Sequence, residues 1–222
     1  GERSHELMGP ASNQWVRDVG AAWYAGPMAD RADDKRATYQ DVLDAPEHLD
    51  AEIIGGELRL SPRPGGPATS VASKLAGELI PPFNDGRGGP GGWIILIEPE
   101  LHLGEEIVVP DLAGWRIERL PMVPEGAFFT VTPDWVCEVI SPWSETIDRL
   151  DKMPLYAAAG VGHAWLLHPR RRSLEAFRLH GGHWLAIAIH RGNVQARIEP
   201  FDAIEIDLSR LWANLPLPTR AS

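Results

Sequence analysis

DWVCEVIS (residues 134–141) is a run of β-branched and aromatic residues of the kind found in a buried central strand. Upstream, WIILIEPELHLG (residues 93–104) and EEIVVPDLAGW (residues 105–115) predict two further strands, joined by a turn near Gly104. Downstream, HAWLLH (residues 163–168) predicts another buried strand. We expect these segments to form the centre of a sheet.

Helices and hairpins are expected on both sides of this centre. Val71, Leu75 and Leu79 recur at helical spacing, which predicts a helix over residues 68–80 that buries one face. Further elements are expected at these places: short helices at residues 39–45 and 155–159, and hairpins around Gly55-Gly56 and Gly181-Gly182. The order of elements predicts a mixed sheet with helices packed on it, in the α/β or α+β class, with extra β-hairpins near both ends.

The composition is that of an ordinary globular protein, with 222 residues of which 44% are hydrophobic. We expect a flexible N-terminal segment (1–37), one folded domain (38–215) and a C-terminal tail (216–222). The longest apolar runs are far shorter than the roughly 20 residues of a membrane span, and no secretory signal is evident. The single cysteine, Cys137, excludes an internal disulfide and favours a reducing, cytoplasmic location.

The net charge argues against broad attraction to a phosphate backbone. It is −10, from 21 Lys and Arg against 31 Asp and Glu. The densest basic cluster, Arg170 to Arg172, could contact phosphates, although a solvated turn is the plainer interpretation. None of the eight histidines occurs in an HxxxH or HExxH pattern, and His180 and His183 flank an expected hairpin tip.

Two carboxylates occupy the central apolar strands. Asp111 ends EEIVVPD and Glu138 lies inside DWVCEVIS, 27 residues later. A carboxylate in a buried strand is costly unless it is paired, hydrogen-bonded or bound to a cation. If the two strands are neighbours, both side chains can converge on one hard cation such as Mg²⁺. By strand alternation, Cys137 should point to the other face of the sheet as a small buried thiol.

Other charged residues near these strands are open to two interpretations. Lys152 precedes the expected helix and could orient an attacking water, or it could be a surface lysine paired with Asp148 or Asp151. Glu100 could be a third carboxylate of the site, or a solvent-facing residue at a strand end. Glu52 and Glu57 of the first hairpin are more typical of structural positions.

Five segments resemble successive motifs of the Uma2 family, which was formerly a domain of unknown function. The resemblance runs from about Thr38 to Leu211 and is specific because the motifs occur in the family's order. It implies the PD-(D/E)XK, restriction-endonuclease-like fold. The segments are ELRLSPRP (57–64), VVPDLAGW (108–115), DWVCEVISP (134–142), DKMPLYAAAGV (151–161) and HAWLLHP (163–169).

The resemblance also implies residue roles. Pro110-Asp111 resembles the PD element and Glu138 the acidic residue of the second half-motif, so these two carboxylates would hold Mg²⁺ or Mn²⁺. Lys152 would be the third catalytic residue and DNA the substrate. Nucleases of this fold that cut both strands often act as dimers, so a homodimer is implied as well.

The chain departs from the family pattern at two positions. Ile140 stands where the general PD-(D/E)XK pattern has lysine, and Uma2-like sequences commonly place a lysine further on, where this chain has Lys152. Ala68 stands where the family often has a histidine. Two hypotheses follow: a metal-dependent DNA endonuclease, which retention of both carboxylates and Lys152 favours, or a non-catalytic module that binds nucleic acid or a protein partner, which the net charge favours.

Overall fold

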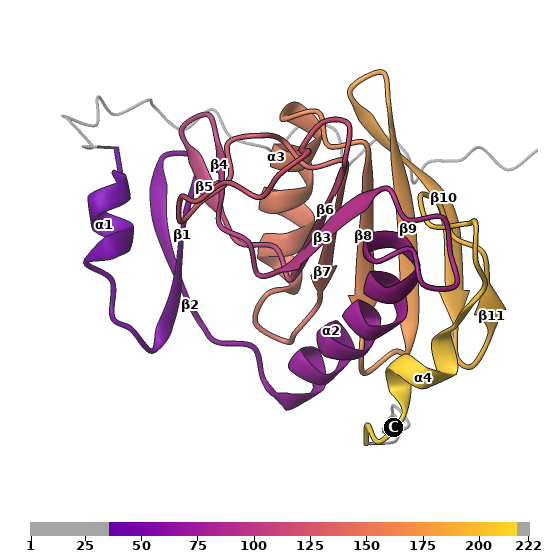
Figure 1. Cartoon of the computed structure of the whole chain (residues 1–222). Coiled ribbons are helices and arrows are strands. Elements are labelled where there is room, and N and C mark those ends of the chain that lie inside the picture. Colours follow the sequence, from indigo (N-terminus) through magenta and orange to yellow (C-terminus); the bar gives the residue numbers. More distant parts are fainter. Residues whose placement is uncertain (1–35, 217–222) are drawn as a thin grey trace, which may run out of the picture. The chain divides into compact units, whose positions relative to one another are not determined.

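A six-stranded mixed sheet organises the fold, in the order β10-β9-β8-β7-β6-β3 (Figure 1). The computed structural model describes residues 36–216, so the expected segments 1–37 and 216–222 fall outside it except for their innermost positions. Only β7 and β8 run parallel, and the other neighbours are antiparallel. The strands are β3 (Trp93–Ile97), β6 (Leu112–Arg116), β7 (Trp135–Val139), β8 (His163–His168), β9 (Ser173–His180) and β10 (His183–Arg191).

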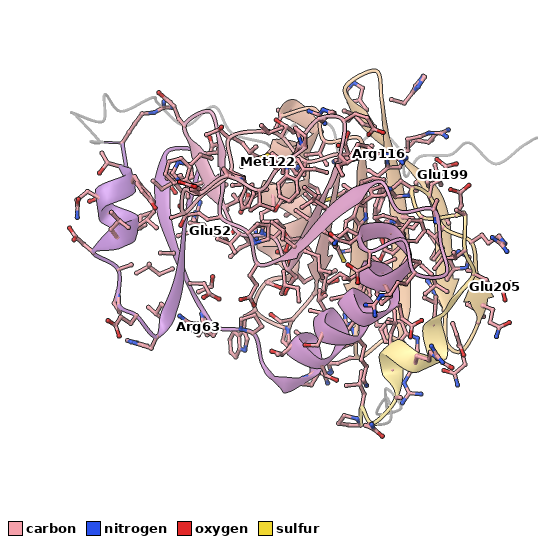
Figure 2. All side chains as sticks on the ribbon, in the orientation of Figure 1. Glu52, Arg63, Arg116, Met122, Glu199 and Glu205 are labelled. Carbon is pink, nitrogen blue, oxygen red and sulfur yellow. The ribbon has the colours of Figure 1, made fainter. Side chains whose placement is uncertain are left out.

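A second, four-stranded sheet has the order β2-β1-β5-β4. It consists of β1 (Leu49–Ile54), β2 (Glu57–Pro62), β4 (Leu101–Leu103) and β5 (Glu106–Val108). The expected first hairpin is present, and Gly55 and Gly56 both take the positive φ that its tight turn requires. Figure 2 shows Glu52 on β1 and Arg63 just beyond β2. A third, two-stranded sheet pairs β11 (Gln195–Ala196) with β12 (Ile206–Asp207).

Four α-helices complete the described part of the chain: α1 (Tyr39–Leu43), α2 (Gly66–Leu79), α3 (Met153–Ala158) and α4 (Leu208–Trp212). Two of them adjoin π-helical turns, Ile80–Asn84 after α2 and Ile147–Lys152 before α3. Helical structure around α3 therefore begins at Ile147, earlier than the short helix expected at residues 155–159.

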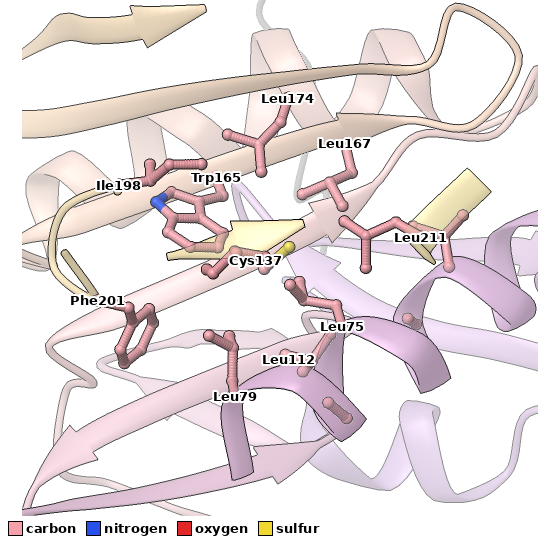
Figure 3. Packing of buried hydrophobic residues seen from close by; sticks show 14 of the residues in the cluster. Leu75, Leu79, Leu112, Cys137, Trp165, Leu167, Leu174, Ile198, Phe201 and Leu211 are labelled. Carbon is pink, nitrogen blue, oxygen red and sulfur yellow. The ribbon is translucent and has the colours of Figure 1, made fainter. Parts of the chain in front are cut away.

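The six-stranded sheet separates two hydrophobic clusters. One cluster joins α2 and α4 to one face of the sheet, and Figure 3 shows Leu75 and Leu79 of α2 packed near Cys137 and Trp165. The other cluster joins α3 to the opposite face, where Tyr156 is fully buried. Cys137 is buried in the first cluster, as strand alternation predicted. None of the helices in the described residues is long and apolar enough to span a membrane.

The two long strands expected over residues 93–115 are each broken in two. The first expected strand becomes β3, in the six-stranded sheet, and β4, in the four-stranded sheet. The second becomes β5, in the four-stranded sheet, and β6, in the six-stranded sheet. Pro99 and Pro110 lie in the breaks, and a proline cannot donate a hydrogen bond to a ladder. Glu98 takes a φ of 49° at the first break. The second break leaves Asp111 at the start of β6.

Candidate active site

Asp111 and Glu138 face each other across neighbouring strands. Leu112 of β6 pairs with Cys137 of β7 in antiparallel register, so the next residues, Asp111 and Glu138, stand opposite each other. Side chains directly opposite on paired strands project from the same face. That face carries Ala113 of β6 and packs against α3. The fold thus brings together the two carboxylates that the sequence singled out.

Each carboxylate is fixed through one of its oxygens. The backbone N–H of Val139 donates to Asp111 Oδ2 at 2.7 Å, and the Tyr156 hydroxyl donates to Glu138 Oε1 at 2.6 Å. Among the residues the structure describes, no donor binds the other oxygen of either group. Both residues line the same pocket. Each therefore has one oxygen oriented by the protein and one left for a ligand.

Lys152 lies in the same cluster and is only 4% exposed. Its Nζ is 2.8 Å from Glu52 Oε1 and 3.1 Å from Glu138 Oε1, and it donates to the Val109 carbonyl at 3.2 Å. The alternative of a surface lysine is therefore wrong. Three acceptors surround the three N–H groups of the ammonium, so a water could join it only by displacing one of them.

Two further carboxylates complete the cluster. Glu52, 6% exposed on β1, accepts the Val109 N–H at 2.7 Å as well as binding Lys152. The structural interpretation of Glu52 overlooked that it interrupts the apolar run AEII, the same signal that marked Glu138. Asp148, 4% exposed, was expected only as a surface partner of Lys152. Its spacing of four residues from Lys152 does place both on one helical face.

Burial and excess negative charge raise the pKa values of three acids of the cluster, Asp111, Glu138 and Asp148. Burial raises the pKa of Asp111 to about 6, although the Val139 N–H opposes the rise. Burial raises the pKa of Glu138 well above its ordinary value despite Lys152, and raises that of Asp148 too. Burial alone would lower the pKa of Lys152, but Glu138 and Glu52 raise it more. Four carboxylates thus share one ammonium, and a further cation would relieve their repulsion.

These residues form one end of a pocket of about 410 Å³ between β1, β2, β7 and the turn before α3. The charged residues of its walls are mostly acidic, with Arg63 and Lys152 as the cations. The acidic residues are Glu47, Asp50, Glu52, Glu98, Glu100, Asp111, Glu138 and Asp148. The pocket therefore favours a cation, or a ligand that arrives with one.

The other sequence candidates have local partners. Glu100 lies on the pocket wall and forms a 2.7 Å hydrogen bond with the His102 ring, so it is near the site but already engaged. Glu57 is exposed and pairs with Arg59. Arg171, in the turn between β8 and β9, pairs with Glu145, as expected of a solvated turn. Ala68 is buried in the first turn of α2.

The donor set fits a cation that needs few protein ligands. Within residues 36–216, no group of three or more His, Cys, Asp or Glu side chains is arranged to hold a metal by itself. Zn²⁺ bound as a structural ion would need such a group. Mg²⁺ commonly takes only one or two carboxylates and completes its shell with water and substrate phosphate. The available oxygens of Asp111 and Glu138 match that requirement.

Comparison with known proteins places the chain in a family. A family model described as "Putative restriction endonuclease" matches residues 36–209. The chain belongs to the Uma2 family. This confirms the resemblance drawn from the five motifs. No curated protein matches the chain.

A solved structure confirms the fold class. The Uma2 chain is similar to the crystal structure of "a putative nuclease belonging to DUF820" from Anabaena variabilis ATCC 29413, with a TM-score of 0.63 and 21% identity. The match covers 79% of this chain and 97% of the other. At this identity the similarity establishes the fold, and the chemistry depends on the site described above. Family and fold together support a nuclease.

Proposed function

We propose that this protein is a metal-dependent endonuclease that hydrolyses phosphodiester bonds in DNA, with Asp111 and Glu138 as ligands of Mg²⁺ or Mn²⁺. The observation that carries the proposal is the pair of opposed carboxylates, each with one oxygen held by the protein and one available in the pocket. Membership of a family described as "Putative restriction endonuclease" supports the same reaction class.

The residues around the carboxylates have separable tasks in this proposal. The Val139 N–H and the Tyr156 hydroxyl keep Asp111 and Glu138 oriented, so that their remaining oxygens stay preorganised. A bound Mg²⁺ would polarise the scissile phosphate and acidify an attacking water. Lys152 would place its positive charge beside Glu138, and release of its contact with the Val109 carbonyl would free one N–H for that water.

The test is nicking of supercoiled plasmid DNA by the purified protein in Mg²⁺, in Mn²⁺ and in EDTA. We expect relaxed circles to accumulate with either metal and not in EDTA. Conversion to linear DNA would require two sites acting together, so the proposed homodimer is checked by measuring the mass of the protein in solution. Equal nicking in EDTA would refute metal dependence.

Metal binding should weaken as pH falls through about 6. A carboxylate must be ionised to bind Mg²⁺, and burial raises the pKa of Asp111 to about 6. The raised pKa of Glu138 moves the transition in the same direction. Calorimetric titration of Mg²⁺ at pH 5 to 8 should show affinity falling at least about tenfold per pH unit below the transition. An affinity that is constant down to pH 5 would exclude these carboxylates as the ligands.

The alternative function is a non-catalytic module that binds nucleic acid or a protein partner. The engagement of all three N–H groups of Lys152 favours it, because the ammonium then acts as the counter-ion of a buried cluster. The two functions differ in one measurement. The module would bind a ligand with or without metal and would leave plasmid DNA intact under all conditions of the nicking assay.

A further inference from the structure

Trp143 is an exposed aromatic residue on the wall of the candidate active site. It is 78% exposed, and within residues 36–216 its indole N–H has no hydrogen-bond partner. The other tryptophans in that range are buried or partly buried. Exposed apolar residues are ordinary when scattered over a surface. Trp143 differs because it lines the pocket that contains Asp111 and Glu138.

A hydrogen-bonded turn holds Trp143 in place. Ser141 Oγ accepts the backbone N–H groups of Trp143 at 3.3 Å and Ser144 at 3.1 Å, and Ser144 Oγ accepts the Ser141 N–H at 3.0 Å. This turn directly follows β7, so its position relative to Glu138 is set by the central sheet. The backbone that carries the indole is therefore fixed before any ligand arrives, which lowers the entropy lost on binding.

The residues that line the pocket are of two chemical kinds. One kind is the set of buried carboxylates with Lys152. Apolar residues also line the pocket: besides Trp143 they include Leu43, 59% exposed, and three prolines, Pro46, Pro62 and Pro64. Arg63 also lines the pocket, and its side chain is largely exposed. A nucleotide has the matching division, because its base presents flat apolar faces and its phosphate is an anion that a metal or arginine can bind.

We propose that Trp143 stacks on a base next to the scissile phosphate, so that the substrate has an unpaired nucleotide at that position. This inference rests on the proposed nuclease function and specifies its substrate. A base inside a duplex has both faces covered by its neighbours, whereas an unpaired base can turn a face toward the indole. Single strands, or duplexes with a local opening, are therefore the favoured substrates.

The test compares Trp143→Ala with Trp143→Phe. Affinity is measured by fluorescence anisotropy for a labelled single-stranded oligonucleotide and for a blunt duplex, with Ca²⁺ replacing Mg²⁺ as the hard cation. We expect Trp143→Ala to weaken single-strand binding about 5- to 150-fold, the range typical of one stacked base, and Trp143→Phe to retain most of the affinity. Duplex binding should change less than about twofold. Met122→Ala is the matched control, because Met122 is also 78% exposed but lies outside the pocket.

The outcomes separate this inference from the proposed function. Unchanged single-strand binding in Trp143→Ala, with nicking that still depends on Asp111, would overturn the stacking role and leave the nuclease intact. A selective loss of single-strand binding in a protein that never nicks DNA would support stacking and refute hydrolysis. Equal losses for single strand and duplex would also overturn stacking on an unpaired base, and absence of any oligonucleotide binding by the unsubstituted protein would overturn both.

Discussion

Asp111→Asn is expected to abolish Mg²⁺-dependent DNA nicking while making the folded protein more stable at pH 8. The amide keeps an oxygen that can accept the Val139 N–H, so the local structure should persist. The substitution removes the negative charge of a proposed metal ligand, so nicking should fall by at least about 100-fold. Glu138→Gln should lose nicking to a similar extent, since Tyr156 can still donate to the amide oxygen.

The gain in stability follows from the pKa of Asp111. Because burial raises that pKa from 3.8 to about 6, the folded state favours the protonated acid. The protonated Asp111 stabilises the folded state fully below pH 3.8, and this stabilisation is lost as pH rises through about 6. Removing the charge should therefore raise the free energy of unfolding at pH 8 by about 1–3 kcal/mol, after allowance for the partial exposure of the side chain. The gain should vanish near pH 4.

Urea denaturation of both proteins at pH 4, 6 and 8, with and without Mg²⁺, measures this effect. Mg²⁺ should stabilise the unsubstituted protein at pH 8 and leave Asp111→Asn unchanged. Glu47→Gln is the matched control, because Glu47 is exposed on the same pocket wall and is not a proposed ligand. If Asp111→Asn nicks DNA as fast as the unsubstituted protein, the activity comes from a contaminant. If it is destabilised at pH 8, the carboxylate has a structural role.

Local sequence signals were sufficient to predict that Asp111 and Glu138 lie together, but not to predict which other charged residues surround them. Asp111 and Glu138 could be paired because each interrupts an apolar strand, and the register of neighbouring strands then follows from alternation. The pairing of β1 with β5 joins Ile53 to Ile107, and nothing in either segment specifies that partner. This long-range pairing is what brings Glu52 beside Lys152. The burial of Lys152 was therefore not evident from its own neighbours in sequence.

The breaks in the central strands have a local cause in two prolines. Pro99 and Pro110 each lack the N–H that a continuous ladder requires, and both lie where a strand passes from one sheet to the other. Because the sequence on both sides of each proline is apolar, its pattern predicts two long strands in place of four short ones. The second of these breaks also positions Asp111.

Lys152→Met is expected to lower the free energy of unfolding at pH 8 by about 3–5 kcal/mol, since it leaves buried carboxylates without their cation. Methionine has a similar length and fills the space, so loss of packing contributes little. Glu52 and Glu138, at 2.8 and 3.1 Å from Nζ, would repel each other, and Glu138 would take up a proton more readily because Lys152 no longer lowers its pKa. The loss should therefore shrink as pH falls toward 5. Nicking should slow, whereas Mg²⁺ binding should persist because no ligand is removed.

A second variant tests whether the stability lost in Lys152→Met comes from the buried carboxylates that Lys152 neutralises. Adding Glu52→Gln to Lys152→Met removes one of the uncompensated charges and keeps an acceptor for the Val109 N–H, so part of the lost stability should return. Lys74→Met is the control: Lys74 is a partly exposed lysine of α2 that contacts the Ala213 carbonyl, and its loss should cost about 1 kcal/mol or less. Urea denaturation of the three variants at pH 5 and 8 gives the comparison. A Lys152→Met protein as stable as the unsubstituted one at pH 8 would show that the ammonium does not neutralise these carboxylates, and Lys152 would then be free to act on the substrate alone.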